Sequence, residues 1–112
     1  MPTNYRDEDR IRLTEVERVI LIALLKGNAL VYELGRTMDA DNREGTPYSS
    51  GTLYPALKRL CVTSMVEKLD PNSAKLSARS LYRITPMGSE ALSWELMRLQ
   101  DQINRAKDRI GR

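Results

Sequence analysis

Histidine is absent from this chain, and cysteine occurs once, at position 61. Without histidine, neither a Ser–His nor a Cys–His nucleophile pair can form, and a zinc site would lack its usual ligands. The chain also has no glycine-rich phosphate loop, and its carboxylates show no spacing typical of a paired acid/base site or an oxygen-ligand cage. We therefore expect no enzyme activity, no metal and no cofactor.

Long apolar segments are missing as well. No stretch approaches the length of about 18 uncharged apolar residues that a membrane span needs. The first ten residues are polar and mixed in charge, which excludes a secretory signal. One cysteine cannot form an internal disulfide, which fits a reducing compartment. We expect a cytoplasmic protein with no membrane partner.

The positive charge is unevenly distributed. A length of 112 residues predicts one domain with a modest core, and a net charge of +3 is too small to indicate nucleic-acid binding by itself. Residues 43–83, however, contain seven Lys or Arg against three acids, a balance of +4. The positive field is therefore concentrated in the middle of the chain.

Residues 49–60 carry the most informative pattern in this region. Ser49 or Ser50 can cap a helix, with a hydroxyl that accepts from a backbone amide two or three residues on. Leucine and alanine at 53, 56, 57 and 60 have helical spacing and form one apolar face. The other face has hydroxyls and cations and no carboxylate: Ser50, Thr52, Tyr54, Lys58 and Arg59. These side chains suit a helix that lies in a DNA groove, and the alternative is an amphipathic helix whose basic face is only solvated.

The preceding residues predict two helices. Thr14 and Glu17 form a capping box for a helix over residues 15–26, which Gly27 ends. Asn28 can cap a second helix over 29–38, and residues 39–47 read as a loop. Helix, loop and basic helix follow one another as in a helix-turn-helix, with a longer connection than usual.

The residues after the basic helix predict a β-hairpin. Residues 65–69 alternate as a strand, 70–73 form a turn, and 79–85 form a second strand. A hairpin directly after a helix-turn-helix makes a wing. Lys75 and Arg79 lie where its tip would meet phosphates or the minor groove, and Arg83 follows on the second strand.

A long helix is predicted from Thr85-Pro86 to Ile110. Its apolar residues follow a heptad spacing: Leu92, Leu96, Leu99, Ile103, Ala106 and Ile110. The helix could pack on its own domain, but a length of about 36 Å exceeds what such a small body can cover, so we favour a seam between two subunits. Trp94 lies off the seam and either packs or contacts a flat ligand.

These residues resemble the PadR family of bacterial winged-helix transcriptional regulators over about residues 13–92. The resemblance is carried by residues 13–15, 32–34, 50–60 and 79–88. It implies a homodimer joined by the C-terminal helix, repression through pseudo-palindromic operators, and insertion of the basic helix into the major groove. It also implies a phosphate contact from Tyr32, and release of DNA when a small aromatic compound binds near Trp94.

The sequence departs from the family pattern at several positions. Leu30-Val31 stands where relatives often have His-Gly, and Ser77-Ala78 replaces a glycine-basic cluster in the wing. The acidic turn and glycine that usually follow the basic helix are here residues 61–64, Cys-Val-Thr-Ser. If a left-handed backbone is needed there, the missing glycine costs on the order of 1 kcal/mol.

The sequence thus predicts a mostly α-helical protein with a small β-hairpin wing. We expect an N-terminal arm over residues 1–12, frayed or helical, a winged helix-turn-helix over 13–85 and a dimerisation helix over 86–112. The expected DNA contacts are Tyr32, Ser49, Ser50, Thr52, Tyr54, Lys58, Arg59, Lys75, Arg79 and Arg83. The expected partners are double-stranded DNA, a second copy of the chain and a small aromatic ligand. A winged-helix adaptor that spreads on DNA or bridges it to a protein is the alternative, because fold alone does not determine function.

Overall fold

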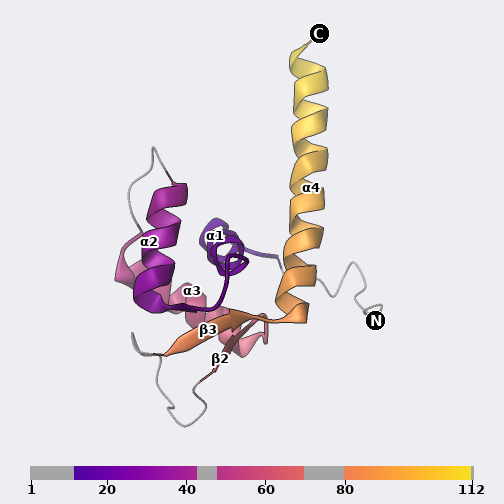
Figure 1. Cartoon of the computed structure of the whole chain (residues 1–112). Helices are drawn as coiled ribbons and strands as arrows, with labels where there is room; N and C mark the ends of the chain where they lie inside the picture. The colour runs from indigo at the N-terminus through magenta and orange to yellow at the C-terminus, as the bar shows by residue number, and fades with distance from the viewer. Residues whose placement is uncertain (1–11, 43–47, 70–79, 112) are drawn as a thin grey trace.

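The computed structural model describes residues 12–42, 48–69 and 80–111, without the side chain of Ser50. The expected N-terminal arm and the wing residues Lys75 and Arg79 lie outside this part of the chain. Four helices and three strands occur in the described part (Figure 1). In order these are α1 (Glu15–Leu24), β1 (Ala29–Leu30), α2 (Val31–Asp41), α3 (Ser50–Val62), β2 (Val66–Lys68), β3 (Leu81–Ile84) and α4 (Pro86–Ile110).

The capping box predicted for α1 is confirmed. Thr14 Oγ1 accepts from the Glu17 amide at 3.2 Å, and Glu17 Oε1 accepts from the Thr14 amide at 2.8 Å. The helix ends at Leu24, two residues earlier than predicted. Gly27 follows with a φ of 149°, a positive value that glycine adopts far more readily than other residues.

The predicted start of α2 was wrong. The helix covers Val31–Asp41 instead of residues 29–38, and its N-cap is Leu30 instead of Asn28. The backbone of Ala29 and Leu30 pairs with β3, so these two residues are extended and cannot be helical. Glu33 Oε1 accepts from the Leu30 amide at 2.9 Å and so satisfies one donor at the helix start.

The predicted hairpin is confirmed, and the sheet contains one further strand. Strands β2 and β3 are antiparallel, with Glu67 opposite Arg83, and β1 joins the other edge of β3 to give the order β1-β3-β2. Tyr82 in the central strand is fully buried. A two-residue strand carries too little alternation to be recognised from sequence.

The connection between α3 and β2 has the left-handed residue that the missing glycine suggested. Ser64 has a φ of 64°, which costs a non-glycine residue roughly 1 kcal/mol. Its carbonyl accepts from Thr85 Oγ1 at 2.6 Å. The same hydroxyl accepts from the Gly88 amide at 3.0 Å, so Thr85 caps α4 and ties the helix start to this turn.

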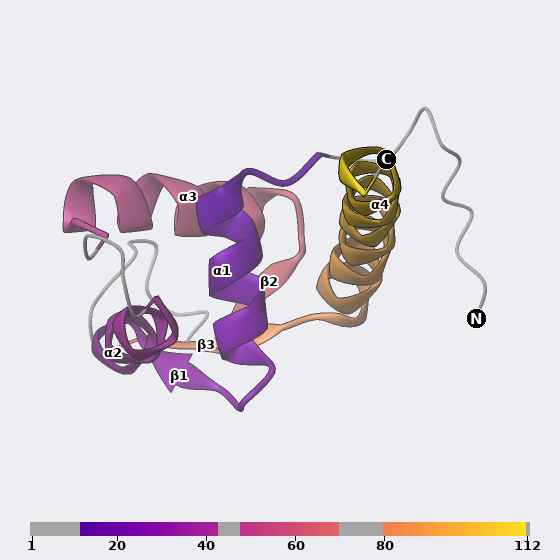
Figure 2. The ribbon, with the colours of Figure 1, turned by 90° about the horizontal axis from the view of Figure 1, so that it is seen from above.

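The core is formed where α1 packs against its neighbours. Viewed from above, α1 lies between α2, α3, the strands and the base of α4 (Figure 2). Its buried residues meet apolar side chains from every other helix, including Leu34, Met38, Leu57, Leu60 and Leu92. This central helix therefore determines how the remaining elements are placed.

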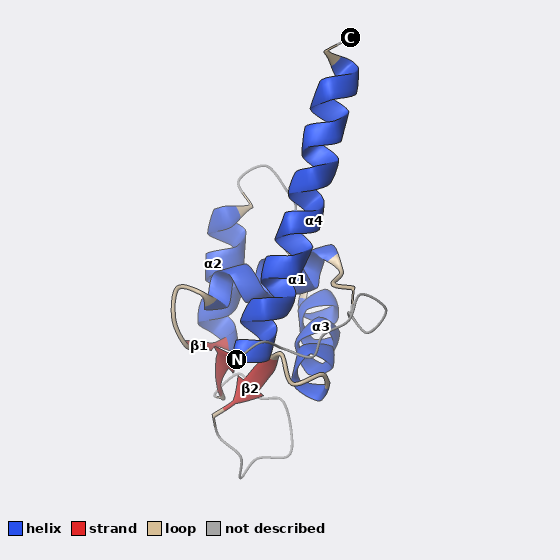
Figure 3. Ribbon diagram, turned by 90° about the vertical axis from the view of Figure 1, so that its right-hand side faces the viewer, coloured by secondary structure: helices blue, strands red, loops and turns tan. Residues whose placement is uncertain are grey.

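Helix α4 extends well past the rest of the molecule (Figure 3). Ala91, Leu92 and Glu95 in its first half are buried, whereas residues 101–111 are all exposed. Within the described residues, no helix is both long enough and apolar enough to cross a membrane. The first half of α4 therefore belongs to the core, and its second half is not covered by any other part of the chain that the structure describes.

We expect Gly88→Ala to destabilise the fold. A Cβ atom at position 88 would lie far inside van der Waals contact of the Met65 carbonyl oxygen, a backbone atom that cannot move alone. The free energy of unfolding should fall by about 1–3 kcal/mol, as for other overpacked sites, in urea denaturation followed by circular dichroism.

Gly35→Ala is the matched control. A Cβ at position 35 meets nothing within 4 Å, and alanine inside a helix is more stable than glycine by roughly 0.5–1 kcal/mol. The two variants should therefore shift the urea midpoint in opposite directions. A Gly88→Ala midpoint equal to or above that of the unmodified protein would contradict this packing.

Candidate nucleic-acid interface

The N-terminus of α3 carries no negative charge in its first turn. Helices α1 and α2 each begin with glutamates there. Ser49 is the N-cap, but its hydroxyl lies 3.3 Å from Thr52 Oγ1 and makes no cap hydrogen bond with the backbone. Ser50, the other predicted cap, has a side chain outside the described part of the structure. The positive end of the helix dipole is therefore open to an anion such as a phosphate.

The two faces of α3 largely follow the prediction. Leu53, Ala56, Leu57 and Leu60 are buried. The described exposed side chains are Thr52, Pro55, Lys58, Arg59 and Val62. Tyr54, predicted on the DNA-facing side, is half-buried and packs against the core. The exposed face is thus narrower than expected and has Lys58 near its middle.

Arg59 is bound to a carboxylate of α1. Its Nη1 donates to both oxygens of Glu17, at 2.6 and 2.5 Å. The Glu17 side chain is only 2% exposed, whereas that of Arg59 is 47% exposed. A buried carboxylate is stable only when it is paired and hydrogen-bonded. Arg59 therefore neutralises Glu17, and only its outer part can face a ligand.

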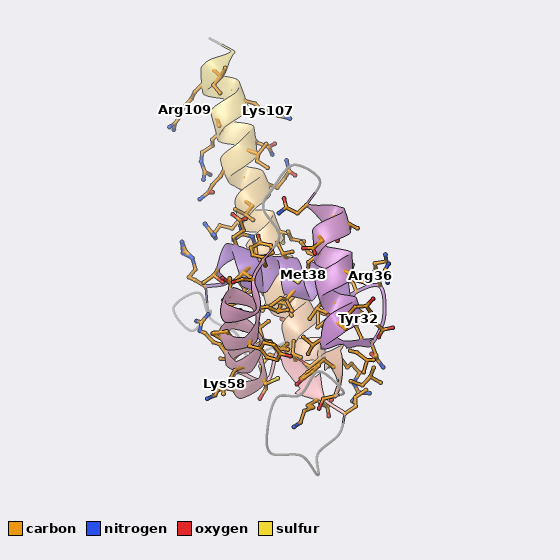
Figure 4. All side chains as sticks on the ribbon, turned by 90° about the vertical axis from the view of Figure 1, so that its left-hand side faces the viewer. Tyr32, Arg36, Met38, Lys58, Lys107 and Arg109 are labelled. Carbon is orange, nitrogen blue, oxygen red and sulfur yellow. The ribbon has the colours of Figure 1, made fainter. Side chains whose placement is uncertain are left out.

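Helix α2 carries an exposed aromatic–cation pair. The Tyr32 side chain is 64% exposed, and the Arg36 guanidinium lies 5.6 Å from its ring centre. Arg36 Nη1 also donates to the Tyr32 hydroxyl at 3.1 Å. Figure 4 shows both residues on α2 and Lys58 on α3 (seen from the side opposite α4). Cation–π contact favours this arrangement and holds the tyrosine in place.

Arg83, on the described part of the wing, is paired with a glutamate. Arg83 Nη2 donates to Glu67 Oε2 at 2.5 Å across the strand pair, and both side chains are about half exposed. Such a surface pair is worth at most about 1 kcal/mol, so Arg83 can exchange Glu67 for another anion at little cost. Lys75 and Arg79 lie outside the described residues.

Cys61 is half-buried and packs against the core. Burial raises the pKa of its thiol, although the charge of Lys68 opposes this shift. A thiol with a raised pKa is a weak nucleophile at neutral pH. These properties are typical of a structural cysteine.

The heptad residues of α4 divide into two groups. Leu92 was predicted in the seam, but it is only 2% exposed and belongs to the core of its own chain. Leu99 is half-buried, and Leu96, Ile103, Ala106 and Ile110 are exposed. Trp94 is half-buried. An uncovered apolar row can therefore begin only at Leu96.

Sequence reasoning missed Arg36 on this surface and the ion pair that the buried Glu17 makes beneath it. Arg36 is four residues after Tyr32, a spacing that places the two side chains together on a helix and could have revealed the pair. Glu17 was recognised as part of a capping box, but its partner Arg59 is 42 residues away in the chain. No local pattern links residues so far apart.

Three helices with a β-hairpin directly after the third define a winged helix-turn-helix DNA-binding protein. The sequence profile of the family described as "Transcriptional regulator PadR-like family" matches residues 20–94. This match covers more than half of the 112 residues. The chain belongs to the PadR-like family, and it is a DNA-binding transcriptional regulator.

Several solved structures share this fold. A transcriptional regulator from Clostridium thermocellum is 22% identical, with a TM-score of 0.70 over 83% of this chain and 87% of that one. A PadR family transcription regulator from Clostridium difficile is 20% identical, with a TM-score of 0.67 over 87% and 98%. RosR from H. salinarum is 23% identical, with a TM-score of 0.62 over 88% and 91%. A sequence search of curated proteins found no match.

We expect Arg59→Ala to destabilise the protein, because it leaves the Glu17 carboxylate buried without a cation. The free energy of unfolding should fall by about 2 kcal/mol or more, measured by urea denaturation. Lys58→Ala is the control. Lys58 is the residue next to Arg59, but it is exposed and has no ion pair among the described residues. A change within about 0.5 kcal/mol is expected there, and equal losses in both variants would contradict the structural role of Arg59.

Proposed function

We propose that this protein is a homodimeric repressor that binds a pseudo-palindromic operator. The observation that carries the proposal is the exposed face of α3, which has Lys58 near its middle and no carboxylate. A helix of this kind after a helix-turn connection lies in the major groove in proteins of this class. Repression follows if the bound dimer blocks access to the promoter, and the site of action is then the cytoplasmic nucleoid.

In this proposal the DNA contacts come from three elements. Ser50, Thr52 and Lys58 on α3 approach the base edges and nearby phosphates. Tyr32 and Arg36 on α2 hold a phosphate, since the pair is exposed and already ordered. The wing contributes Lys75, Arg79 and Arg83, as the sequence predicts, and Ser49, Tyr54 and Arg59 support α3 at its edges. Phosphate contacts position such a protein, and base contacts specify the sequence.

Dimerisation follows from the uncovered half of α4. Leu96, Leu99, Ile103, Ala106 and Ile110 keep a 3-4 spacing past the end of the domain, and Ile110 is 83% exposed. A heptad row of apolar side chains is normally covered by a second helix. Two-fold symmetry would place the α3 helices about 34 Å apart, one turn of DNA.

Trp94 is the candidate effector contact within this proposal. It lies between the buried first turns of α4 and the exposed apolar row, and its side chain is half-buried. A flat aromatic compound that bound beside it would contact the proposed dimer interface directly. Such binding can release DNA only if the compound prefers the dimer geometry that does not fit the operator.

Lys58→Ala should weaken binding to every duplex by a similar factor. Each subunit of the dimer loses one phosphate contact, so the slope of log affinity against log salt should fall by about two, measured by fluorescence anisotropy between low and moderate salt. Lys107→Ala is the matched control, because Lys107 lies at the far end of α4 (Figure 4). An unchanged slope in Lys58→Ala would remove this lysine from the phosphate contacts.

Ile103→Asp should convert the dimer to a monomer, because it places a charge in the middle of the proposed seam. Analytical ultracentrifugation would detect the change, and affinity for a full palindrome should fall at least about tenfold as the second half-site is lost. Met97→Asp is the control, since Met97 is exposed but lies off the heptad positions. A dimer that survives Ile103→Asp would contradict the seam.

A further inference from the structure

We propose that Glu17 is a positioning residue for DNA recognition. Its buried carboxylate holds Arg59 and thereby fixes α3 on α1 in the orientation that reads a specific sequence. The inference rests on the proposed function, in which α3 lies in the major groove. It concerns a side chain that cannot touch DNA itself, because it is almost completely buried.

The orientation of the Glu17 carboxylate is fixed by a contact at the start of α1, independently of α3. Glu17 Oε1 accepts from the Thr14 amide at 2.8 Å, so the first turn of α1 fixes its orientation. Arg59 Nη1 then reaches both oxygens, at 2.6 and 2.5 Å. A charge buried at this depth is costly without its partner. Placements of α3 that withdraw Arg59 from Glu17 are therefore disfavoured.

Apolar packing does not supply the same directional constraint. The buried face of α3 consists of leucines and alanine, and hydrophobic burial is non-directional. A small rotation or slide of α3 would change many short-range apolar contacts, none of which by itself selects one orientation. The same movement would separate Arg59 from Glu17 and shift Thr52 and Lys58, which lie on the same helix. The ion pair thus fixes the position of Thr52 and Lys58, which are proposed to contact DNA, relative to α1.

Helix α1, which carries Glu17, is itself held against α4. Arg18, the next residue of α1, lies 3.5 Å from Glu95 on α4, and Glu95 is only 5% exposed. Arg98 Nη2 binds the same carboxylate oxygen at 2.7 Å. Adjacent residues of α1 therefore link to α3 on one side and to α4 on the other. In a dimer joined through α4, the contacts from α4 to α1 and from α1 to α3 determine where each α3 helix contacts the DNA.

If Glu17 positions α3, neutralising it should weaken operator binding, whereas electrostatics alone predicts stronger binding to any DNA. Neutralising Glu17 removes a negative charge near DNA and releases Arg59 from its partner, so non-specific affinity should stay equal or rise. Loss of the fixed orientation should at the same time weaken binding to the operator. The ratio of operator affinity to non-specific affinity is therefore the quantity that separates the two effects.

Glu17→Gln is the most direct variant, because glutamine can also occupy this position of a capping box. The operator would be selected from a random-sequence pool with the unmodified protein, and a scrambled duplex of equal length would measure non-specific binding by anisotropy. We expect the affinity ratio to fall about tenfold, comparable with the loss from one mismatched base pair. Thr14→Ala is the control, because it removes the cap and keeps the ion pair, so its ratio should be unchanged.

A second variant tests the inference even if Glu17→Gln unfolds at the assay temperature. Glu17→Gln with Arg59→Gln removes both charges and leaves no unpaired buried charge, and its affinity ratio should be equally low. If either variant has the same ratio of operator to non-specific affinity as the unmodified protein, the positioning role is overturned. A native protein that does not distinguish the selected duplex from the scrambled one would instead overturn the proposed function, and this inference with it.

Discussion

The placement of α3 depends on one ion pair between a buried carboxylate and a half-exposed guanidinium. Glu17 is held by its own helix and Arg59 comes from α3, so the pair joins two elements that the chain separates by α2 and a long loop. Tyr48, just before α3, adds a second link because its hydroxyl donates to Glu15 at 3.0 Å. Burial and the nearby Glu15 carboxylate raise the pKa of Tyr48. Both links end on α1.

The exposed charges divide into those with partners and those without. Arg59 and Arg83 each face a carboxylate, whereas Lys58 on α3 has no ion pair among the described residues. A net count of basic residues therefore overstates the free positive charge of the interface. Lys58, the start of α3 and the Tyr32–Arg36 pair are features of the described surface that can attract an anion. All three lie on α2 or α3 and not on α4.

Much of the fold could be predicted from sequence because it is encoded locally. The Thr14–Glu17 capping box, the Thr85–Pro86 helix start and the apolar spacing of α3 each occupy a few consecutive residues, and the structure has all three. The start of α2 could not be predicted in this way, since Ala29 and Leu30 pair with a strand about 50 residues later. The left-handed turn at Ser64 was anticipated only as a possible cost, because its need depends on how α3 meets β2 and α4.

The sequence by itself determined the order of the four helices and of the two hairpin strands, the basic character of α3 and the heptad spacing of α4. Periodicity, capping and turn chemistry act over neighbouring residues, and they can be read without knowing what packs against them. Only the tertiary structure decided that Arg59 binds Glu17, that Tyr54 turns into the core and that Leu92 is covered by its own chain. Whether a side chain on a helix is free or engaged depends on residues distant in sequence, because burial and ion pairing arise only when the elements are packed together.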